Sequence, residues 1–240
     1  MISGSDWKIA DDGWPVLAMA GIVTIVTSLI SLPIGCFALG LMVWLAHGLR
    51  VPNRQTAADE QSIYAPADGL ILDITTTNFP DGMMSDTAVV AGVAGVAGAA
   101  RCITIQTRLS DLQLQTSPIT GHIVENLLLP GLFTSWGDNP ASWQAARQVN
   151  ERREIYIRDA FNRDIVLVQL GSKTARQLVC RLAEGKLVQA GSPIGMARIA
   201  GVVDLYVPAD CKITIKRGQH VIAGETVVAQ FARRPASKQG

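Results

Sequence analysis

A run of 34 residues without a charged side chain, positions 13–46, is the feature that most restricts how this chain can fold. Helices of soluble proteins usually have about 8–20 residues and keep one polar face. A single helix over the whole run would far exceed the ~20 residues that cross a bilayer core. Proline and glycine interrupt helices, so we expect a hairpin of two short helices that turns at residues 32–35. Each arm would either barely span a bilayer or enter one leaflet and return.

The residues that flank this run indicate how a hairpin would sit. Trp14 and Trp44 lie near its ends, where indole rings favour the headgroup zone, and Arg50 and Arg54 follow it. A cleaved signal peptide would begin with basic residues, whereas this chain begins with net negative charge. We therefore predict that residues 1–50 form a membrane-anchoring hairpin in the cell (inner) membrane. Residues 51–240 should then form a domain on the cytoplasmic side.

Composition narrows the remaining functions. Charged residues make up only 17% of the chain and the net charge is +1, so nothing points to a nucleic-acid partner. The histidines show no metal-ligand spacing, and we predict no metal site. The cysteines form no CxxC pair, which is typical of reduced thiols on the cytoplasmic side. These residues are His47, His122 and His220, and Cys36, Cys102, Cys180 and Cys211.

Beyond the apolar run, apolar and polar residues alternate over short stretches that are separated by turn residues. The clearest stretches are residues 70–74, 102–106, 154–157, 164–168 and 212–215. This periodicity of two predicts β-strands joined by hairpins. Residues 174–182 are the one helical candidate, because four apolar side chains would share a face. The uncharged Ala/Gly/Val run at 88–100 is typical of a mobile insertion.

An internal echo sharpens the β prediction. Residues 185–194 recur 33 positions later as 218–227, with matching glycines. A Pro-x-x-Gly turn occurs at 66–69 and at 118–121, with a variant at 208–211. Each glycine should supply a backbone angle that other residues resist. We therefore expect a mainly β fold: two interleaved sheets in a compact sandwich of quasi-repeated hairpins, with one or two short helices.

Five motifs follow one another in an order and spacing that resemble a known family. They are Ala-Pro-Ala-Asp-Gly at 65–69, Ser-Pro-x-x-Gly-x-Ile at 117–123, Pro-Gly-x-Phe at 130–133, Asn-Glu-Arg at 150–152, and a Gly-x-x-Arg-x-x-Gly-x-Val-Asp-x-Tyr-x-Pro segment at 195–208. Together with the apolar N-terminal hairpin, they resemble the short bacterial and archaeal type of phosphatidylserine decarboxylase proenzyme over nearly the whole chain.

The resemblance implies a specific chemistry. Such a proenzyme cuts its own backbone before the serine of a Gly-Ser pair, and the serine becomes an N-terminal pyruvoyl group. This carbonyl forms a Schiff base with the amine of phosphatidylserine and accepts electrons as carbon dioxide leaves. An Asp-His pair assists the serine, as in a catalytic triad.

Carried over position by position, only part of this machinery is present. Asp68 stands at the family's aspartate position, but Gln113 replaces the histidine of a His-Val-Asn-Arg segment. Ala200 and Gly201 replace the Gly-Ser pair. Glycine has neither a β-carbon nor a hydroxyl group, so processing could not start there. We therefore expect no pyruvoyl cofactor and a non-catalytic homologue. It would bind anionic phospholipid such as phosphatidylserine, or pair with itself or with an active paralogue.

Two alternatives stay open. Leu-Gly-Ser at 170–172 makes Ser172 a replacement pyruvoyl precursor, which would give fragments 1–171 and 172–240 and an active phosphatidylserine decarboxylase that makes phosphatidylethanolamine. Gly-Ser pairs are common in turns, however, and Ser172 and Ser192 are both typical turn residues. Aspartate likewise caps turns, which would explain Asp68 without catalysis. The second alternative is a lipoyl- or biotinyl-type carrier, for which Lys212 is a poor match.

Overall fold

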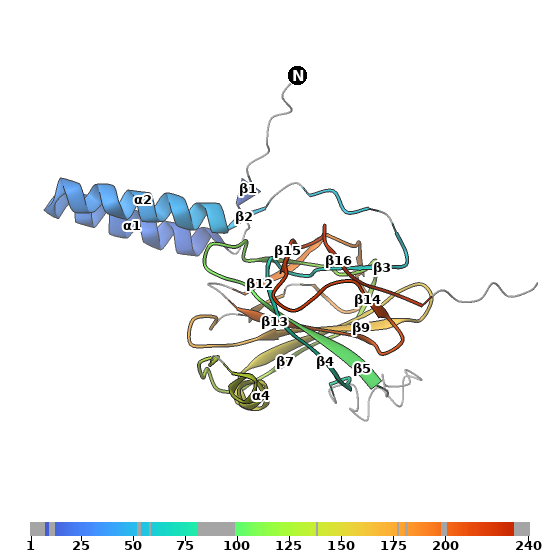
Figure 1. Ribbon diagram of the computed structural model, residues 1–240. Coiled ribbons are helices and arrows are strands. Elements are labelled where there is room, and N and C mark those ends of the chain that lie inside the picture. Colours follow the sequence, from blue (N-terminus) through green and yellow to red (C-terminus); the bar gives the residue numbers. More distant parts are fainter. Residues whose placement is uncertain are drawn as a thin grey trace, which may run out of the picture.

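The computed structural model describes residues 8–9, 13–51, 54–57, 59–80, 99–137, 139–176, 178–180, 182–197 and 201–232. Within these residues the fold is mainly β, with a pair of helices at the N-terminal end (Figure 1). The helices project together away from the β-strands (Figure 1). Their base packs on the β-strands through a small apolar cluster that contains Leu17, Leu49 and Met196.

The N-terminal hairpin consists of α1 (Trp14–Ile30) and α2 (Leu32–Gly48). Ser31 separates them in an extended conformation, so the break comes just before the predicted turn at 32–35. The reason is that proline suits the first turn of a helix, and Pro33 lies in the first turn of α2. The two helices pack so closely at Gly35 that a β-carbon there would collide with Ser28.

The hairpin is apolar on almost all sides. Its hydroxyl groups are turned back onto its own backbone: Thr24, Thr27 and Ser28 each donate to a carbonyl in the preceding turn. Many large apolar side chains are exposed, among them Leu29 (84%) and Leu32 (73%) at the tip. Among the described residues, however, no helix combines the length and the apolar character needed to cross a membrane.

A curled antiparallel sheet of eight strands forms the main body. Its order is β11-β7-β8-β9-β13-β5-β4-β15. The bounds are β4 (Gly69–Asn78), β5 (Ala99–Gln106), β7 (Gly121–Leu129), β8 (Arg152–Arg158), β9 (Asp164–Leu170), β11 (Leu187–Val188), β13 (Val202–Pro208) and β15 (His220–Val221). Val203, Leu205 and Val207 on β13 point into the main core, whereas Val202 and Tyr206 face a second cluster on the opposite side.

Smaller elements complete the fold. One three-stranded sheet has the order β10-β12-β6 (Leu178–Val179, Pro193–Ala197, Leu114–Thr116), and another β14-β16-β3 (Lys212–Ile213, Val227–Gln230, Ser62–Tyr64). A two-stranded sheet, β1 (Lys8–Ile9) with β2 (Arg50–Val51), joins the two ends of the hairpin. Helix α4 (Pro140–Val149) lies against the second face of the large sheet, where Arg147 reaches Asp204.

Most strand predictions are confirmed. Residues 70–74, 102–106, 154–157 and 164–168 lie within β4, β5, β8 and β9, whereas only the first two residues of 212–215 are a strand. The sheets differ from the predicted pair, because one eight-stranded sheet is combined with smaller ones. Of the predicted insertion at 88–100, residues 88–98 lie outside the described residues and 99–100 begin β5.

The predicted helix at 174–182 is wrong. Leu178–Val179 form strand β10, which pairs with β12. Ala175 and Leu178 are indeed buried together, as the predicted apolar face required. Two buried residues three apart are compatible with a turn followed by a strand, so the spacing did not distinguish helix from strand over so short a segment.

The internal echo has a structural counterpart, which we call the two half-repeats. The first combines residues 65–78 with 218–227, and the second combines 117–129 with 185–194. Gly218 donates to the carbonyl of Ile71 in the first, as Gly185 donates to that of Ile123 in the second. Likewise Gly224 bonds to Ala65, and Gly191 to Ser117.

The glycine predictions hold for the echo. Gly185, Gly191, Gly218 and Gly224 all have φ between 72° and 81°, a region that favours glycine. Of the two Pro-x-x-Gly turns, Gly69 also has a positive φ. Gly121 does not, and that part of the prediction is wrong: glycine is needed there because a β-carbon would collide with the carbonyl of Arg158.

Candidate functional site

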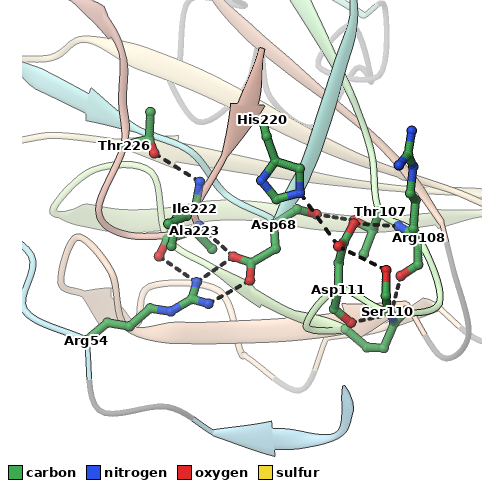
Figure 2. A network of polar contacts seen from close by, with 11 residues as sticks. Arg54, Asp68, Thr107, Arg108, Ser110, Asp111, His220, Ile222, Ala223 and Thr226 are labelled. Carbon is green, nitrogen blue, oxygen red and sulfur yellow. Dashed lines mark hydrogen bonds and ion pairs between the residues drawn. The ribbon is translucent and has the colours of Figure 1, made fainter. Parts of the chain in front are cut away.

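Asp68 lies in the turn before β4, at the centre of a polar network (Figure 2). Arg54 grips both of its carboxylate oxygens, with Nη1–Oδ1 and Nη2–Oδ2 distances of 2.5 and 2.6 Å. The backbone N–H of Ala223 donates to Oδ1 at 2.7 Å, and Arg54 also donates to the carbonyl of Ala223. Both side chains are at least 86% buried. The carboxylate is therefore neutralised by a bidentate guanidinium and fixed to the turn at 222–226.

The second half-repeat shows what this position does without a charge. Thr120 is the counterpart of Asp68, and its hydroxyl accepts from the N–H of Ala190 at 3.0 Å. Ala190 in turn is the counterpart of Ala223. The same backbone group is thus capped in both halves, so Asp68 caps the opposing turn at 222–226 rather than its own turn.

Asp68 and Gly201 lie close together in space, because Thr107 hydrogen-bonds to both of them. The Thr107 hydroxyl donates to the backbone carbonyl of Asp68 at 2.8 Å, and the Thr107 N–H donates to the carbonyl of Gly201 at 2.9 Å. Gly201 is buried and comes directly before β13. Ala200, the other half of the expected cleavage pair, lies outside the described residues.

Gln113 is 6% exposed and holds its own loop. Its side-chain amide donates to the carbonyls of Arg108 and Asp111, at 2.9 and 2.8 Å. Its backbone N–H donates to the carbonyl of Gly48, the last residue of α2. Gln113 therefore ties the loop at 108–111 to the base of the hairpin.

Comparison with known proteins shows the family. A family model described as phosphatidylserine decarboxylase matches residues 41–229. Three curated relatives are all named phosphatidylserine decarboxylase proenzyme. That of Ehrlichia chaffeensis is 29% identical over 95% of this chain and 93% of its own, and that of Pelagibacter ubique 31% over 93% and 96%. That of Saccharopolyspora erythraea is 31% identical over 80% of this chain and 75% of its own.

The chain belongs to the phosphatidylserine decarboxylase family. The resemblance places Gly201 where such proenzymes have the serine that becomes the pyruvoyl group, and glycine does not fit that role. Gly201 offers no hydroxyl as a nucleophile and no β-carbon for elimination. Beside it, the retained Asp68 is bound to Arg54 and Ala223. This arrangement holds the carboxylate in place.

Ser172, the alternative precursor in this family member, lies at the same end of the large sheet as Gly201. Leu170 at the end of β9 pairs with Val202 at the start of β13, and Ser172 follows two residues later. Its hydroxyl accepts from the N–H of Ala175 at 3.0 Å and lies 3.1 Å from the Thr174 hydroxyl. The side chain thus closes a turn, as does Ser192, which donates to the carbonyl of Gln189.

Residues that the sequence analysis missed complete the network. Arg54 was interpreted only as a flanking charge, although it is the main partner of Asp68. A histidine also reaches this region, but from β15: the His220 ring lies 3.6 Å from Asp111, with 53% of its side chain exposed. The echo at 218–227 was the available signal, because it predicted a turn that the network uses. His122 is exposed, and its ring lies 3.3 Å from the carbonyl of Gly185.

Within the ranges that the structure describes, no group of three or more His, Cys, Asp or Glu residues could hold a metal ion. Chemically, the network supplies one neutralised carboxylate, backbone amides, and a His-Asp contact in which the histidine is exposed.

Proposed function

We propose that this chain is a membrane-associated, non-catalytic member of the phosphatidylserine decarboxylase family, with a lipid-binding or regulatory role in phospholipid metabolism. The observation that carries the proposal is Gly201, which lacks the atoms from which a pyruvoyl group is made. Gly201 is linked through Thr107 to Asp68, whose carboxylate is held by Arg54.

The decisive measurement is the mass of the purified full-length chain under denaturing conditions, combined with a carbonyl-reactive probe. We expect one uncut chain of 240 residues and no probe signal. Two fragments, the smaller one carrying a carbonyl, would overturn the proposal. The mass of the smaller fragment would then identify the processed serine.

Ser172 gives the second candidate, an active phosphatidylserine decarboxylase that makes phosphatidylethanolamine. The pairing of Leu170 with Val202 favours it, because this register brings Ser172 to the end of the sheet where Gly201 lies. The closed turn around its hydroxyl argues against it. Cleavage between residues 171 and 172, abolished by Ser172→Ala, would establish this function. Decarboxylation that persists in Ser172→Ala would exclude this serine.

Membrane association rests on the hairpin. Two helices of 17 residues each reach about 25 Å from the base, which suits insertion into a bilayer from one side. The exposed tip, with Leu29 and Leu32, would enter first and leave the β domain on the cytoplasmic side. Anionic phospholipid such as phosphatidylserine is the proposed partner, and a second copy or an active paralogue could join at the same surface.

Vesicle flotation tests this part of the proposal. The chain should float with phosphatidylcholine vesicles and more strongly when phosphatidylserine is included. Leu29→Asp with Leu32→Asp should abolish flotation, because buried carboxylates oppose insertion. The matched control is Leu187→Asp, which changes an exposed leucine of the β domain. Equal loss in the control, or none in the tip variant, would exclude the hairpin as the anchor.

A further inference from the structure

A cavity of about 740 Å³ lies on the second face of the large sheet, beside α4. It is bordered by α4, by β8, β9 and β13, and by residues 77–80 at the end of β4. It shares no lining residue with the Asp68 network. Its volume falls within the roughly 300–1,000 Å³ of small-molecule sites. We call it the α4 cavity.

Two buried carboxylates form its floor. Asp204 and Glu154 lie in one cross-strand row, on either side of Val168. The Nε of Arg147 donates to Asp204 at 2.5 Å, and the Nε of Arg152 donates to Glu154 at 2.8 Å. Arg147 comes from α4 and also donates to Thr104 and to the second oxygen of Asp204.

The two members of each pair differ in exposure. The carboxylate side chains are each 1% exposed, whereas the side chains of Arg147 and Arg152 are 22% and 33% exposed. The network as a whole is neutral, but its accessible part is guanidinium. In the part of the chain that the structure describes, Nη1 of Arg147 and Nη2 of Arg152 have no hydrogen-bond partner. The cavity therefore offers hydrogen-bond donors that carry a positive charge.

Stability alone does not explain this arrangement. Val166, Val168, Leu170 and Val202 form an apolar cluster on the same face. Replacing a buried ion pair by packed apolar residues is often neutral or stabilising. Two such pairs beside an apolar cluster, opening into a cavity, are better explained by a ligand than by packing.

We infer that the α4 cavity binds a small organic anion with a short apolar body. Its anionic head would accept hydrogen bonds from Arg147 and Arg152, and its body would lie against Phe79, Val168 and Leu170. A phosphate or a carboxylate head satisfies this chemistry. The inference is independent of the proposed function, because it uses neither the hairpin nor Gly201.

Hexyl phosphate is the probe, titrated into the full-length chain by calorimetry at constant ionic strength. Hexanol supplies the body without the charge, and inorganic phosphate supplies the head without the body. Hexyl phosphate should bind at one site, more tightly than inorganic phosphate, and hexanol should not bind there. Absence of hexyl phosphate binding, or equal binding of hexanol, would overturn the inference.

Two variants locate the site. Gln148→Trp should fill the mouth of the cavity and weaken binding at least about tenfold, whereas Gln144→Trp, one turn earlier on α4, should not. Arg152→Met with Glu154→Met removes one buried pair and should keep the fold while weakening binding by a similar factor. If this double variant fails to fold, the comparison of Gln148→Trp with Gln144→Trp tests the location of the site. Unchanged affinity in Gln148→Trp would place the probe elsewhere, for example on the hairpin, and would refute the inference.

Discussion

The two half-repeats are built alike, yet only the first carries a charge at its capping position. In both, a side chain accepts a backbone N–H from the opposing turn: Asp68 from Ala223 and Thr120 from Ala190. Asp68 also binds Arg54, in the segment that comes from the hairpin. The difference teaches that the carboxylate fastens the hairpin linker to the β domain. Asp68 therefore has a structural role that does not depend on catalysis.

Removal of the charged cap should have the largest effect. Asp68→Ala leaves Arg54 buried without its partner, and we expect a loss of about 3 kcal/mol in the free energy of unfolding. Urea denaturation measures it. Arg54→Met combined with Asp68→Thr, which copies the other half-repeat, should recover most of the loss. A double variant as unstable as Asp68→Ala would contradict the linker role.

Substitutions of the turn glycines by alanine should differ in their cost to stability, because the glycines differ in how much space surrounds them. Gly191→Ala places a β-carbon against Thr56 at a positive φ, so it should cost about 2 kcal/mol or more. Gly185→Ala and Gly218→Ala have the same backbone strain in open space and should each cost about 1 kcal/mol. Thermal unfolding at one pH ranks the three. Unequal losses for Gly185 and Gly218 would break the likeness of the two halves.

The uncharged cap should matter less than the charged one. Thr120→Ala removes a single hydrogen bond to the N–H of Ala190 at an exposed position, so a loss of about 1 kcal/mol is expected. Urea denaturation beside Asp68→Ala makes the comparison direct. Equal losses for the two substitutions would show that Arg54 adds nothing at Asp68.

The exposed histidine should have the smallest effect. His220 corresponds to Leu187 in the other half-repeat, its contact with Asp111 is long at 3.6 Å, and its own side chain is 53% exposed. His220→Leu should change the free energy of unfolding by less than about 0.5 kcal/mol. A loss above 1 kcal/mol would show that the His-Asp pair holds the 107–113 loop against β15.

Local patterns predicted the local elements well. The uncharged run predicted the helical pair, and alternation predicted β4, β5, β8 and β9, because both signals come from one contiguous segment. Ser31 ends α1 before the proline because Pro33 fits the first turn of α2, which composition alone does not reveal. The segment at 174–182 was too short for the spacing of its apolar residues to distinguish a helix from a strand.

The partners across the fold could not be predicted. The echo at 185–194 and 218–227 predicted two similar turns, but not that each pairs with a strand far away in the sequence. The ion pair of Arg54 and Asp68 joins two irregular segments that carry no periodicity. The row of Asp204, Val168 and Glu154 depends on the register of three strands, which no single segment encodes.

The crossed assembly of the half-repeats decides what a cut in the chain would do. Each half takes one segment from before residue 171 and one from after it: 65–78 with 218–227, and 117–129 with 185–194. If the chain were cut between 171 and 172, each half-repeat would contain segments of both pieces. Hydrogen bonds between strands and a common apolar core would hold the two pieces together. The pieces should migrate as one particle under native conditions, so only denaturation would reveal the cut.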